Sequence, residues 1–568
     1  MDNQPDRFDV VIIGAGVAGA LCACELKTAR PEARILLLEA GANPLDPARR
    51  KAYTDAYQVS ATQPTTAPYA DLPNNRDRWA PSSDGTGDPL VMNAYYVEAG
   101  PDLFKSGYQR MVGGSTWAWR GNCPRFLPAD FALKSTYKVA VDWPFDYAEL
   151  EPYYARAEAE LGVTGNTEEW HPHLTPRSTE FPMAGILPSY GDDLVRTALT
   201  DIPPIDGTPV TLVTNPQARN SVDYQGRPAC EGNSSCVPIC PSGAKYDASV
   251  HVTRALGLGV ELRTGCVAVR LLADPDDRVS TVVFKDWTTA DRAEQRVSGG
   301  QVVLALGAVE TAKLWLLSDL KNESDQVGRN LMDHPTEEVV GLFREPVFPF
   351  RGPQTVLSVE TFRDGAFRKD VGGFRMTVGN DGWGRTESPA AALDKLMWDG
   401  KAKRILLFGQ ELRDRLEDKV TRMLRFSYST EQLPLPENRV TLSDEKDALD
   451  VRRPRIAYRI DDYSKRSLAY GHSVVRRIWQ YLEDTAGATE VDPKQPLLKF
   501  KGSGHTMGTM RMGAEKGKAV VDPDGRSHSH PNVWVVGASV FPTGGTANPT
   551  LTLAAVTIRT AEKLAAVL

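Results

Sequence analysis

The chain has 568 residues, of which 66 are basic and 73 acidic, and a formal net charge of −7 at pH 7. No block of like charge stands out, which argues against nucleic acid as a partner. A chain this long exceeds one simple hydrophobic core, so we expect two closely packed domains. Residues 1–8 are polar and acidic, and no window reaches the ~20 apolar residues that cross a bilayer. We therefore expect no secretory signal and no membrane span, so any membrane or periplasmic address would have to come from a partner.

The first forty residues predict a βαβ unit that binds a nucleotide. Residues 8–13 (FDVVII) form a β-branched run typical of a buried parallel strand, and they lead directly into the motif GAGVAG at 14–19. Residues 20–29 predict a helix and 34–39 a second strand. The glycines permit a tight turn, close approach of backbone to a pyrophosphate and close helix packing, while Glu39 is placed to accept ribose hydroxyls. At this point the ligand could be NAD or FAD.

The C-terminal residues favour FAD. Residues 533–536 (VWVV) predict another buried strand, followed by a Gly-Ala turn, a loop rich in Gly and Thr, and a helix over 551–564. Between the two ends, residues 301–311 (QVVLALGAVET) form a further strand-to-helix unit. A chain that returns this late closes one nucleotide domain around a long, buried cofactor, which NAD enzymes rarely need.

With these pieces the sequence resembles the glucose-methanol-choline (GMC) flavoprotein oxidoreductases over essentially its whole length. The matching motifs, in chain order, are VVIIGAGVAG with LLLEAG, VGGSTW at 112–117, VVLALGAVETAKLWLLS, VGRNLMDHP at 327–335, HTMGTMRMG at 505–513 and GASVFPTGGTANPTLTLAA. Six ordered motifs are highly specific. Within the family the chain looks most like the catalytic subunits of bacterial FAD and iron-sulfur dehydrogenases that act on gluconate, fructose, sorbitol or glucose.

The resemblance implies a fold of mixed α/β and α+β class with two discontinuous domains. A Rossmann-like FAD-binding domain would comprise residues 1–45, 105–130, 216–334 and 500–568. A substrate domain built on an antiparallel sheet would comprise residues 46–104, 131–215 and 335–499. Residues 425–443 (RFSYSTEQLPLPENRVTLS) fit that sheet as alternating strands around a Pro-rich turn.

The resemblance also implies which residues contact FAD. They lie in the glycine turns, in the loop that wraps the flavin and at the start of the last helix: Gly14, Gly16, Val17, Ala18, Gly19, Glu39, Gly113, Gly114, Ser115, Thr116, Trp117, Ala118, Gly307, Gly537, Ala538, Asn548, Pro549 and Thr550. Some relatives carry a histidine near the position of Ala118 that tethers FAD covalently. Because alanine cannot do so, we expect the FAD to be non-covalent.

Alcohol oxidation by a flavin needs a base for the hydroxyl proton, and histidine is the usual choice near neutral pH. By the family match, His505 is the catalytic base and Asn548 orients the hydroxyl and donates hydrogen bonds to the oxygen as charge develops on it. The alternative for any single histidine is a structural role. His334 lies in the Asp-His-Pro part of VGRNLMDHP, where packing is as reasonable an interpretation as function. Glu431 could line the pocket, although a position at the surface or at a strand end fits it better.

Seven cysteines are present, an odd number that does not indicate a disulfide framework. Three of them, Cys230, Cys236 and Cys240, form the pattern C-x5-C-x3-C-P, which resembles the end of a ferredoxin-type motif and lacks the paired spacing of a zinc ribbon. The related sugar dehydrogenases carry a [3Fe-4S] cluster on such a segment, so the resemblance implies one here. Structural thiols, or zinc with a distant ligand such as Cys266, are the alternatives.

These features together predict an FAD-dependent dehydrogenase for an alcohol carbon of a sugar, sugar acid, polyol or glycoside. A cluster carries electrons singly, which favours a cytochrome c acceptor over oxygen. The family's catalytic subunits commonly travel with a small subunit that bears a twin-arginine signal, which favours the periplasm over the cytoplasm. Three alternatives remain: a peroxide-producing sugar oxidase of the same family, a flavin-binding electron-transfer or chaperone-like protein without a substrate pocket, and an NAD-dependent dehydrogenase.

Overall fold

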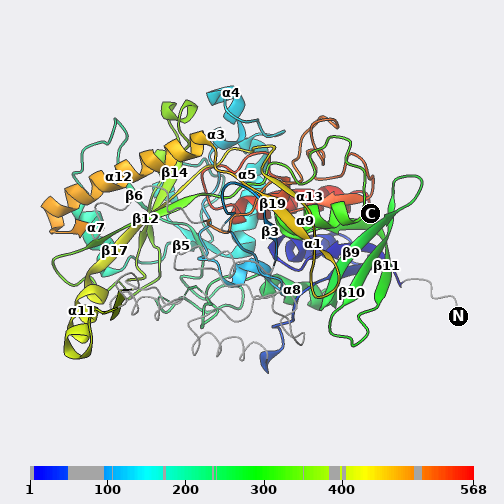
Figure 1. Ribbon diagram of the computed structural model, residues 1–568, viewed down its shortest axis with the longest axis horizontal. Coiled ribbons are helices and arrows are strands. Elements are labelled where there is room, and N and C mark those ends of the chain that lie inside the picture. The colour runs from blue at the N-terminus through cyan, green and yellow to red at the C-terminus, as the bar shows by residue number, and fades with distance from the viewer. Residues whose placement is uncertain are drawn as a thin grey trace.

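The computed structural model describes residues 6–48, 95–104, 106–170, 174–232, 234, 236–237, 239–349, 351–382, 397–399, 404–490 and 502–568. These residues form two lobes, each around a large β-sheet (Figure 1). In Figure 1 one lobe contains β9 to β11 with α1 and α13, and the other contains β12, β14 and β17 with α12 along its outer edge. No helix of the described residues is long and apolar enough to cross a membrane.

The first lobe contains a seven-stranded sheet whose central strands are parallel. In spatial order the main path is β8 (Glu261–Arg263), β2 (Ile35–Leu38), β1 (Asp6–Ile13), β11 (Glu294–Leu304), β10 (Val279–Asp286) and β9 (Cys266–Ala273), with β21 (Val533–Val535) also on β11. On the side of β11 away from β1, two strands pair with it in succession. Antiparallel β10 pairs with its first half, and parallel β21 pairs with its last three residues. The first and last strands of the chain therefore enter one sheet, as the sequence predicted.

Helices with small side chains pack closely against this sheet. Helix α1 (Val17–Ala29) is buried along most of its length, and its buried positions are mainly Ala, Gly, Cys and Leu. It packs against α13 (Thr550–Ala565) and α8 (Ser249–Gly257). Helix α9 (Gly307–Leu317) follows β11. Small residues let helix backbones approach one another, so Cys22 and Cys24 in α1 are packing residues with buried thiols.

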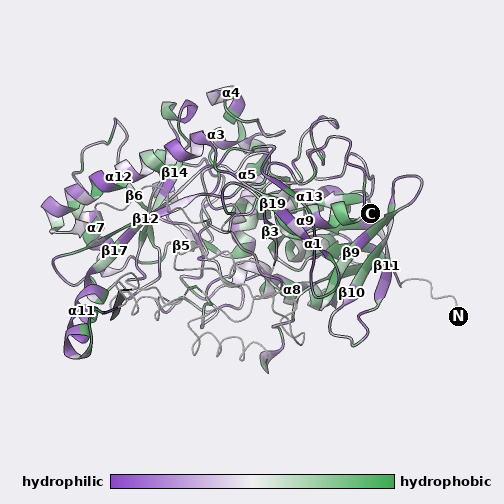
Figure 2. Cartoon of the chain, viewed as in Figure 1, coloured by the Kyte–Doolittle hydropathy of each residue, from purple (hydrophilic) through white to green (hydrophobic). Residues whose placement is uncertain are grey.

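The second lobe contains a six-stranded antiparallel sheet. Its order is β20 (Thr489–Glu490), β12 (Thr336–Leu342), β17 (Met423–Thr430), β14 (Phe374–Gly379), β13 (Leu357–Val359) and β6 (Leu212–Thr214). One face is apolar and packs against α12 (Asp462–Ala486) and α7 (Tyr190–Ala198). Because side chains alternate along a strand, the opposite face of β14 and β17 carries polar residues. Helix α11 (Gly409–Arg422), which has no buried residue, projects from this lobe and is coloured mostly hydrophilic (Figure 2).

The remaining elements are short or lie between the lobes. Three-stranded sheets join β18 (Arg439–Lys446), β19 (Arg452–Ala457) and β3 (Val97–Glu98), and β5 (Met183–Ala184), β4 (Val163–Gly165) and β7 (Gln217–Ala218). β15 (Trp398–Asp399) pairs with β16 (Arg404–Ile405). The other helices are η1 (Gly114–Trp117), α3 (Pro128–Phe131), α4 (Leu133–Tyr137), α5 (Tyr147–Leu161), α6 (Thr167–Trp170), η2 (Thr361–Arg363), η3 (Ala366–Lys369) and η4 (Ala538–Val540).

One expectation about strand pairing is wrong. Residues 425–443 were expected to form strands of one sheet, but only β17 belongs to the six-stranded sheet, and β18 pairs with β19 instead. Pro434 and Pro436 lie between the two strands, and proline cannot donate to a β-ladder. The N–H of Val440 donates to the carbonyl of Gly328 at 2.8 Å, and the N–H of Leu331 donates to that of Asn438 at 2.9 Å, which holds β18 against the segment at 327–331, away from β17.

The predicted domain boundaries stay a prediction. The strands of segments 1–45, 216–334 and 500–568 belong to the first sheet with one exception: β7, at the start of segment 216–334, is in a small sheet with β4 and β5. Most of the predicted segment 46–104 lies outside the described residues.

Candidate active site

The first glycine turn is shaped by packing at two of its glycines and is open at the third. Gly14 has φ 107°, and a Cβ there would lie 2.6 Å from the carbonyl oxygen of Ala305. A Cβ on Gly19 would lie 1.9 Å from the carbonyl oxygen of Gly14. A Cβ on Gly16 would meet no atom within 4 Å. The backbone at Gly16, just before α1, is therefore free to approach a ligand.

The other predicted cofactor segments converge on this turn. The N–H of Gly113 donates to the carbonyl of Ala15 at 2.9 Å, and a Cβ on Gly114 would lie 3.2 Å from the Cα of Gly16. A Cβ on Gly537 would lie 3.3 Å from the Cβ of Ala18. These segments, hundreds of residues apart in the sequence, form one structure that we call the cradle: residues 14–19, 39, 113–118, 307, 537–538 and 548–550.

The remaining predicted residues occupy the ends of elements in the cradle. Val17 and Ala18 begin α1, Gly307 begins α9, Ala538 begins η4, and Thr550, preceded by Pro549, begins α13. Ser115, Thr116 and Trp117 form η1, and Ala118 caps it. Helix N-termini present free N–H groups, which suit the phosphates of a dinucleotide.

Glu39 lies directly after β2, beside the glycine turn, and is 5% exposed. Its carboxylate accepts hydrogen bonds from the backbone N–H of Ala15 at 2.8 Å and of Gly41 at 2.7 Å. Burial raises its pKa, although these two donors oppose the shift. Each oxygen retains a lone pair for a further donor. The position agrees with the predicted ribose contact, which stays a prediction.

The predicted catalytic residues are adjacent. His505 Nε2 lies 3.0 Å from Asn548 Nδ2. The segment after His505 is held on both sides, since Met507 pairs with Met332 and Gly508 donates to the carbonyl of Ala538 at 3.0 Å. Three family motifs, VGRNLMDHP, HTMGTMRMG and GASVFP, are thus hydrogen-bonded side by side.

Two residues whose role the sequence did not establish support this pair. His334 Nδ1 lies 2.9 Å from His505 Nδ1, and Arg375 Nη1 donates to Asn548 Oδ1 at 2.6 Å. Burial holds the pKa of His505 well below its usual value, and His334 and the Arg375 guanidinium add to this effect. His505 is therefore neutral near pH 7 and able to accept a proton.

The polar face of the six-stranded sheet forms a wall beside the catalytic pair. Arg425 of β17 donates to both carboxylate oxygens of Asp381 at 2.8 and 2.7 Å and to Glu338 of β12 at 3.2 Å. Arg375 of β14 pairs in the same way with Glu360. Ser427 donates to Glu338 at 3.2 Å. The arginines of this wall are thus paired with carboxylates, and hydroxyl groups such as that of Ser427 lie between the ion pairs.

The cysteine loop, residues 230–240, lies against two buried cations. Burial would lower the pKa of Arg219, but the sulfurs of Cys230, Cys236 and Cys240 outweigh this effect and raise it. Lys245 Nζ donates to the carbonyls of Cys236, Trp117 and Trp119 at 2.6, 2.9 and 2.5 Å. Lys245 therefore joins the cysteine loop to residues 113–120, the segment predicted to wrap the flavin.

Within the described ranges, no group of three His, Cys, Asp or Glu side chains is arranged to hold a metal ion. The metal assignment of Cys230, Cys236 and Cys240 therefore stays a prediction. Cys266, the distant alternative ligand, begins β9, and its thiol donates to the carbonyl of Thr264 at 3.4 Å.

Comparison with known proteins identifies the family. Two models described as GMC oxidoreductase match residues 216–336 and 434–557. The chain is 34% identical to the fructose dehydrogenase large subunit of Gluconobacter japonicus over 99% of both chains. The chain belongs to the GMC oxidoreductase family. It is also 30% identical to paromamine 6'-oxidase of Streptomyces fradiae, over 99% of this chain and 92% of the relative.

A solved GMC-type neighbour confirms the fold. The structure of pyridoxine 4-oxidase from Mesorbium loti matches with a TM-score of 0.63 and 18% identity, covering 98% of this chain and 99% of that one. Family membership makes this GMC protein an oxidoreductase that acts on CH–OH donors and implies FAD as its cofactor. The NAD-dependent and non-catalytic alternatives are thereby set aside.

The cradle fits FAD in a second respect. Three residues that are close in sequence to its segments carry buried polar atoms with no hydrogen-bond partner among the described residues: both amide atoms of Gln109, Thr311 Oγ1 of α9 and Ser539 Oγ of η4. Buried polar groups are normally satisfied, so these orphaned atoms are available to a polar ligand. A Cβ on Gly307, at the N-terminus of α9, would likewise meet nothing within 4 Å.

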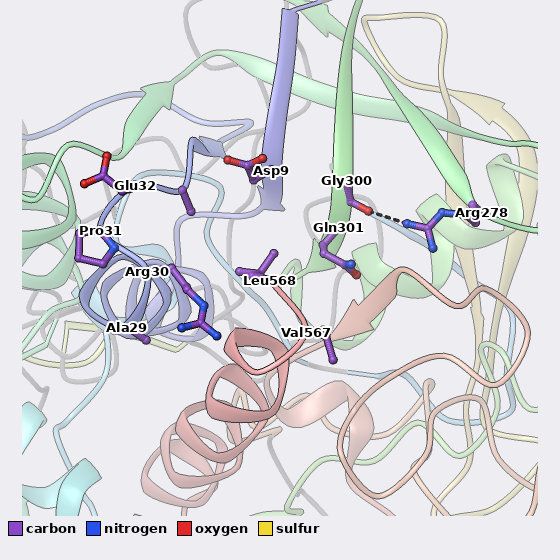
Figure 3. Close-up of a pocket in the computed structure, with 11 residues that line it drawn as sticks. Asp9, Ala29, Arg30, Pro31, Glu32, Arg278, Gly300, Gln301, Val567 and Leu568 are labelled. Carbon is purple, nitrogen blue, oxygen red and sulfur yellow. Dashed lines mark hydrogen bonds between the residues drawn. The ribbon is translucent and has the colours of Figure 1, made fainter.

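One cavity of the described residues is a different feature. It has a volume of about 540 Å³ and is lined by residues including Asp9, Arg30, Gln301 and Leu568, with Arg278 donating to the carbonyl of Gly300 at 3.2 Å (Figure 3). It contains none of the predicted site residues and lies beside the middle of β1, whereas dinucleotides bind beyond the carboxyl ends of such strands.

Sequence reasoning missed Arg375 in this GMC chain, and of its two alternatives for Glu431 the strand end is right and the surface position is wrong. Glu431 does follow a strand end, but it is only 2% exposed and accepts hydrogen bonds from Arg368, Tyr463 and the backbone of Gly373. It is a buried structural carboxylate. No local sequence pattern distinguishes Arg375 from other arginines in strands. His334, in contrast, lies in a family motif, which indicated that it could have a functional role.

Proposed function

We propose that the protein is an FAD-dependent dehydrogenase that oxidises an alcohol carbon of a sugar, sugar acid, polyol or glycoside and passes electrons singly to a cytochrome c. The observation that carries this proposal is the 3.0 Å contact between His505 Nε2 and Asn548 Nδ2 beside the cradle. Burial holds the pKa of this histidine well below its usual value, which favours its neutral form. Bound FAD supplies the hydride acceptor. His505 accepts the hydroxyl proton at Nε2, and the Asn548 amide N–H groups donate to the substrate oxygen as charge develops on it.

Within this class the wall favours a neutral polyhydroxylated substrate over a sugar acid. The two arginines of the wall, Arg375 and Arg425, are each bound to carboxylates at hydrogen-bond distance. A substrate carboxylate would have to displace one of these buried partners, and leaving a buried charge unpaired is costly. Hydroxyl groups, in contrast, can add hydrogen bonds to the edges of paired charges without breaking them.

The proposed exit for electrons is a [3Fe-4S] cluster held by Cys230, Cys236 and Cys240. Such a cluster supplies one-electron transfer. The residues present fit it, because thiolate ligands bring negative charge into a buried region and Arg219 and Lys245 place two cations there. Trp117 also packs against Ile239, so the cysteine loop directly contacts residues 113–120, which we propose wrap the flavin.

Similarity to a fructose dehydrogenase large subunit supports a small-molecule substrate and assembly with other subunits. We extend the proposal to a small subunit with a twin-arginine signal, a cytochrome c partner and a periplasmic location. The FAD is proposed to be non-covalent, since Ala118 offers no nucleophile.

The second candidate is a sugar oxidase that reduces oxygen, which the similarity to paromamine 6'-oxidase favours. One experiment separates the two. Purified protein is assayed with neutral sugars and polyols in air for peroxide and for reduction of cytochrome c, and its iron is counted. A dehydrogenase should contain about three iron atoms per chain, show a paramagnetic signal when oxidised, and form little peroxide. Iron-free protein that forms stoichiometric peroxide would establish the oxidase.

A further inference from the structure

A continuous series of hydrogen bonds passes through the catalytic pair and ends in groups that can act in only one way. At one end, His334 Nε2 lies 3.2 Å from the carbonyl oxygen of Gly544 and 3.1 Å from that of Gly545. In the middle, the histidines contact each other through their Nδ1 atoms, and His505 Nε2 contacts Asn548. At the other end, Arg375 donates to the oxygen of Asn548.

The carbonyl end determines the proton positions on both histidines. A carbonyl oxygen can only accept, so His334 must carry its proton on Nε2. Burial lowers the pKa of His334 to about 4, and the ring is therefore neutral and bears a lone pair on Nδ1. His505 must then donate its own Nδ1–H to that lone pair at 2.9 Å. The neutral His505 is left with its lone pair on Nε2.

The arginine end gives the same answer independently. A guanidinium can only donate, so it faces the oxygen of the Asn548 amide, and the NH₂ group of Asn548 faces His505. An amide NH₂ can only donate, which again requires a lone pair on His505 Nε2. Arg375 is itself fixed, since its Nε and Nη2 donate to Glu360, and its Nη2 donates to Asn215 at 2.7 Å.

We propose that His334 and Arg375 are positioning residues that fix the tautomer of His505 and the orientation of the Asn548 amide, so that Nε2 is always the atom presented as the base. This inference rests on the proposed role of His505. In the reaction the substrate hydroxyl enters between Nε2 and the Asn548 NH₂ group, donating to the first and accepting from the second. The substrate O–H bond then breaks, an Nε2–H bond forms, and hydride leaves the same carbon for FAD. His334 continues to accept from Nδ1–H throughout, so the imidazolium that forms is held in place.

Without His334 and Arg375, neutral His505 could carry its proton on Nε2, and this tautomer should lower the activity. A proton on Nε2 of neutral His505 would face the NH₂ of Asn548, placing two donors opposite each other, and would remove the lone pair that accepts the substrate proton. Loss of the group that orients a metal-bound histidine commonly costs roughly 10- to 100-fold in activity, and we expect a loss of that order here.

The test compares two substitutions at one position. In His334→Gln the side-chain NH₂ can donate to the glycine carbonyls and its oxygen can accept from His505, so the tautomer is retained. In His334→Leu a similar volume is kept and no acceptor remains. We expect His334→Leu to lower kcat for anaerobic flavin reduction roughly 10- to 100-fold, with KM and FAD content little changed, and His334→Gln to recover most of that rate. Equal rates in both variants and the parent would overturn the proposal.

Two further measurements keep the result clear. Selective ¹⁵N labelling of the eight histidines should show neutral His505 protonated on Nδ1 in the parent and in His334→Gln, and a signal for protonation on Nε2 would overturn the proposal. Arg375→Met removes a cation that lowers the pKa of His505, while Arg363 still pairs with Glu360 at 3.2 Å, so no carboxylate is left unpaired. The acidic limb of the kcat profile should therefore move to higher pH, and an unmoved limb would remove Arg375 from the mechanism.

These outcomes are distinct from a failure of the proposed function. If His505→Ala reduced FAD at the parental rate, His505 would not be the base and both proposals would fall. If His505→Ala were inactive while His334→Leu kept the parental rate, only the positioning proposal would fall.

Discussion

Segments from both ends and from the middle of the chain form the cradle, whereas the three cysteines of the cysteine loop lie within residues 230–240. The cradle is made mostly of backbone: glycine turns, helix N-termini and strand ends. The cysteine loop presents three side chains to two buried cations, Arg219 and Lys245.

The difference teaches how each site depends on its ligand. A backbone site is fixed by the sheet and helices that carry it, so its form is complete when the chain has folded. Three thiolates close together repel one another, and a metal centre is what makes their approach favourable. Buried cations offset part of that repulsion. Substitutions in the cradle should therefore change FAD content and the reduction of FAD by substrate, whereas substitutions in the cysteine loop should change iron content and electron delivery to cytochrome c.

The largest effect is expected in the catalytic pair. His505→Ala should slow reduction of bound FAD by substrate by roughly 10²- to 10⁴-fold, because the hydroxyl proton loses its acceptor. FAD and iron content should stay at parental levels, since His505 is part of neither the glycine turns nor the cysteine loop. Stopped-flow absorbance under anaerobic conditions measures the rate. The matched control is His528→Ala, which removes a histidine ring that lies 2.9 Å from the carbonyl of Gly513, outside the catalytic pair. Parental rates in His505→Ala would remove it from the mechanism.

The next largest effect is expected at the cysteine loop, where a substitution should slow electron delivery to cytochrome c more than reduction of FAD. Cys236→Ser should lower iron content and slow electron delivery to cytochrome c by at least about tenfold more than it slows reduction of FAD. Iron analysis and paired half-reaction assays measure both. Cys266→Ser is the control, because Cys266 is bound near Thr264 in β9. Loss of iron from Cys266→Ser would instead identify it as a fourth ligand, and an unchanged iron content in Cys236→Ser would contradict the cluster.

The smallest effect should come from two glycines of one turn. Gly16 has φ −77°, and its Cβ would meet no protein atom within 4 Å, so Gly16→Ala should leave the free energy of unfolding of the apoprotein within about 1 kcal/mol while weakening FAD binding. Gly19→Ala would collide with the backbone of Gly14 and should destabilise the fold by about 1–3 kcal/mol. Denaturant unfolding and FAD titration distinguish them. Equal FAD affinity in Gly16→Ala and the parent would show that the turn does not contact the cofactor.

Much of the first lobe was predictable because its signals are local. The apolar run at Val10–Ile13 and the glycines after it determine a strand and a turn with little outside help. The partner of β18 was not predictable in the same way, because strand pairing depends on which distant backbone is available. The contact between Arg375 and Asn548 joins residues 173 apart in sequence. It follows from the docking of two lobes, which no local pattern encodes.

The position of Arg375 has a consequence for attempts to change substrate preference. Arg375 lies on β14, a strand of the wall, but its guanidinium donates a hydrogen bond to the side-chain amide of Asn548, which precedes α13 in the other lobe. Neighbours on the same face, such as Thr377 and Ser427, can be exchanged to suit new hydroxyl patterns without disturbing the proton acceptor. Position 375 cannot be exchanged so freely, because any replacement chosen there to bind a different substrate would also remove the hydrogen bond to Asn548, a member of the proposed catalytic pair.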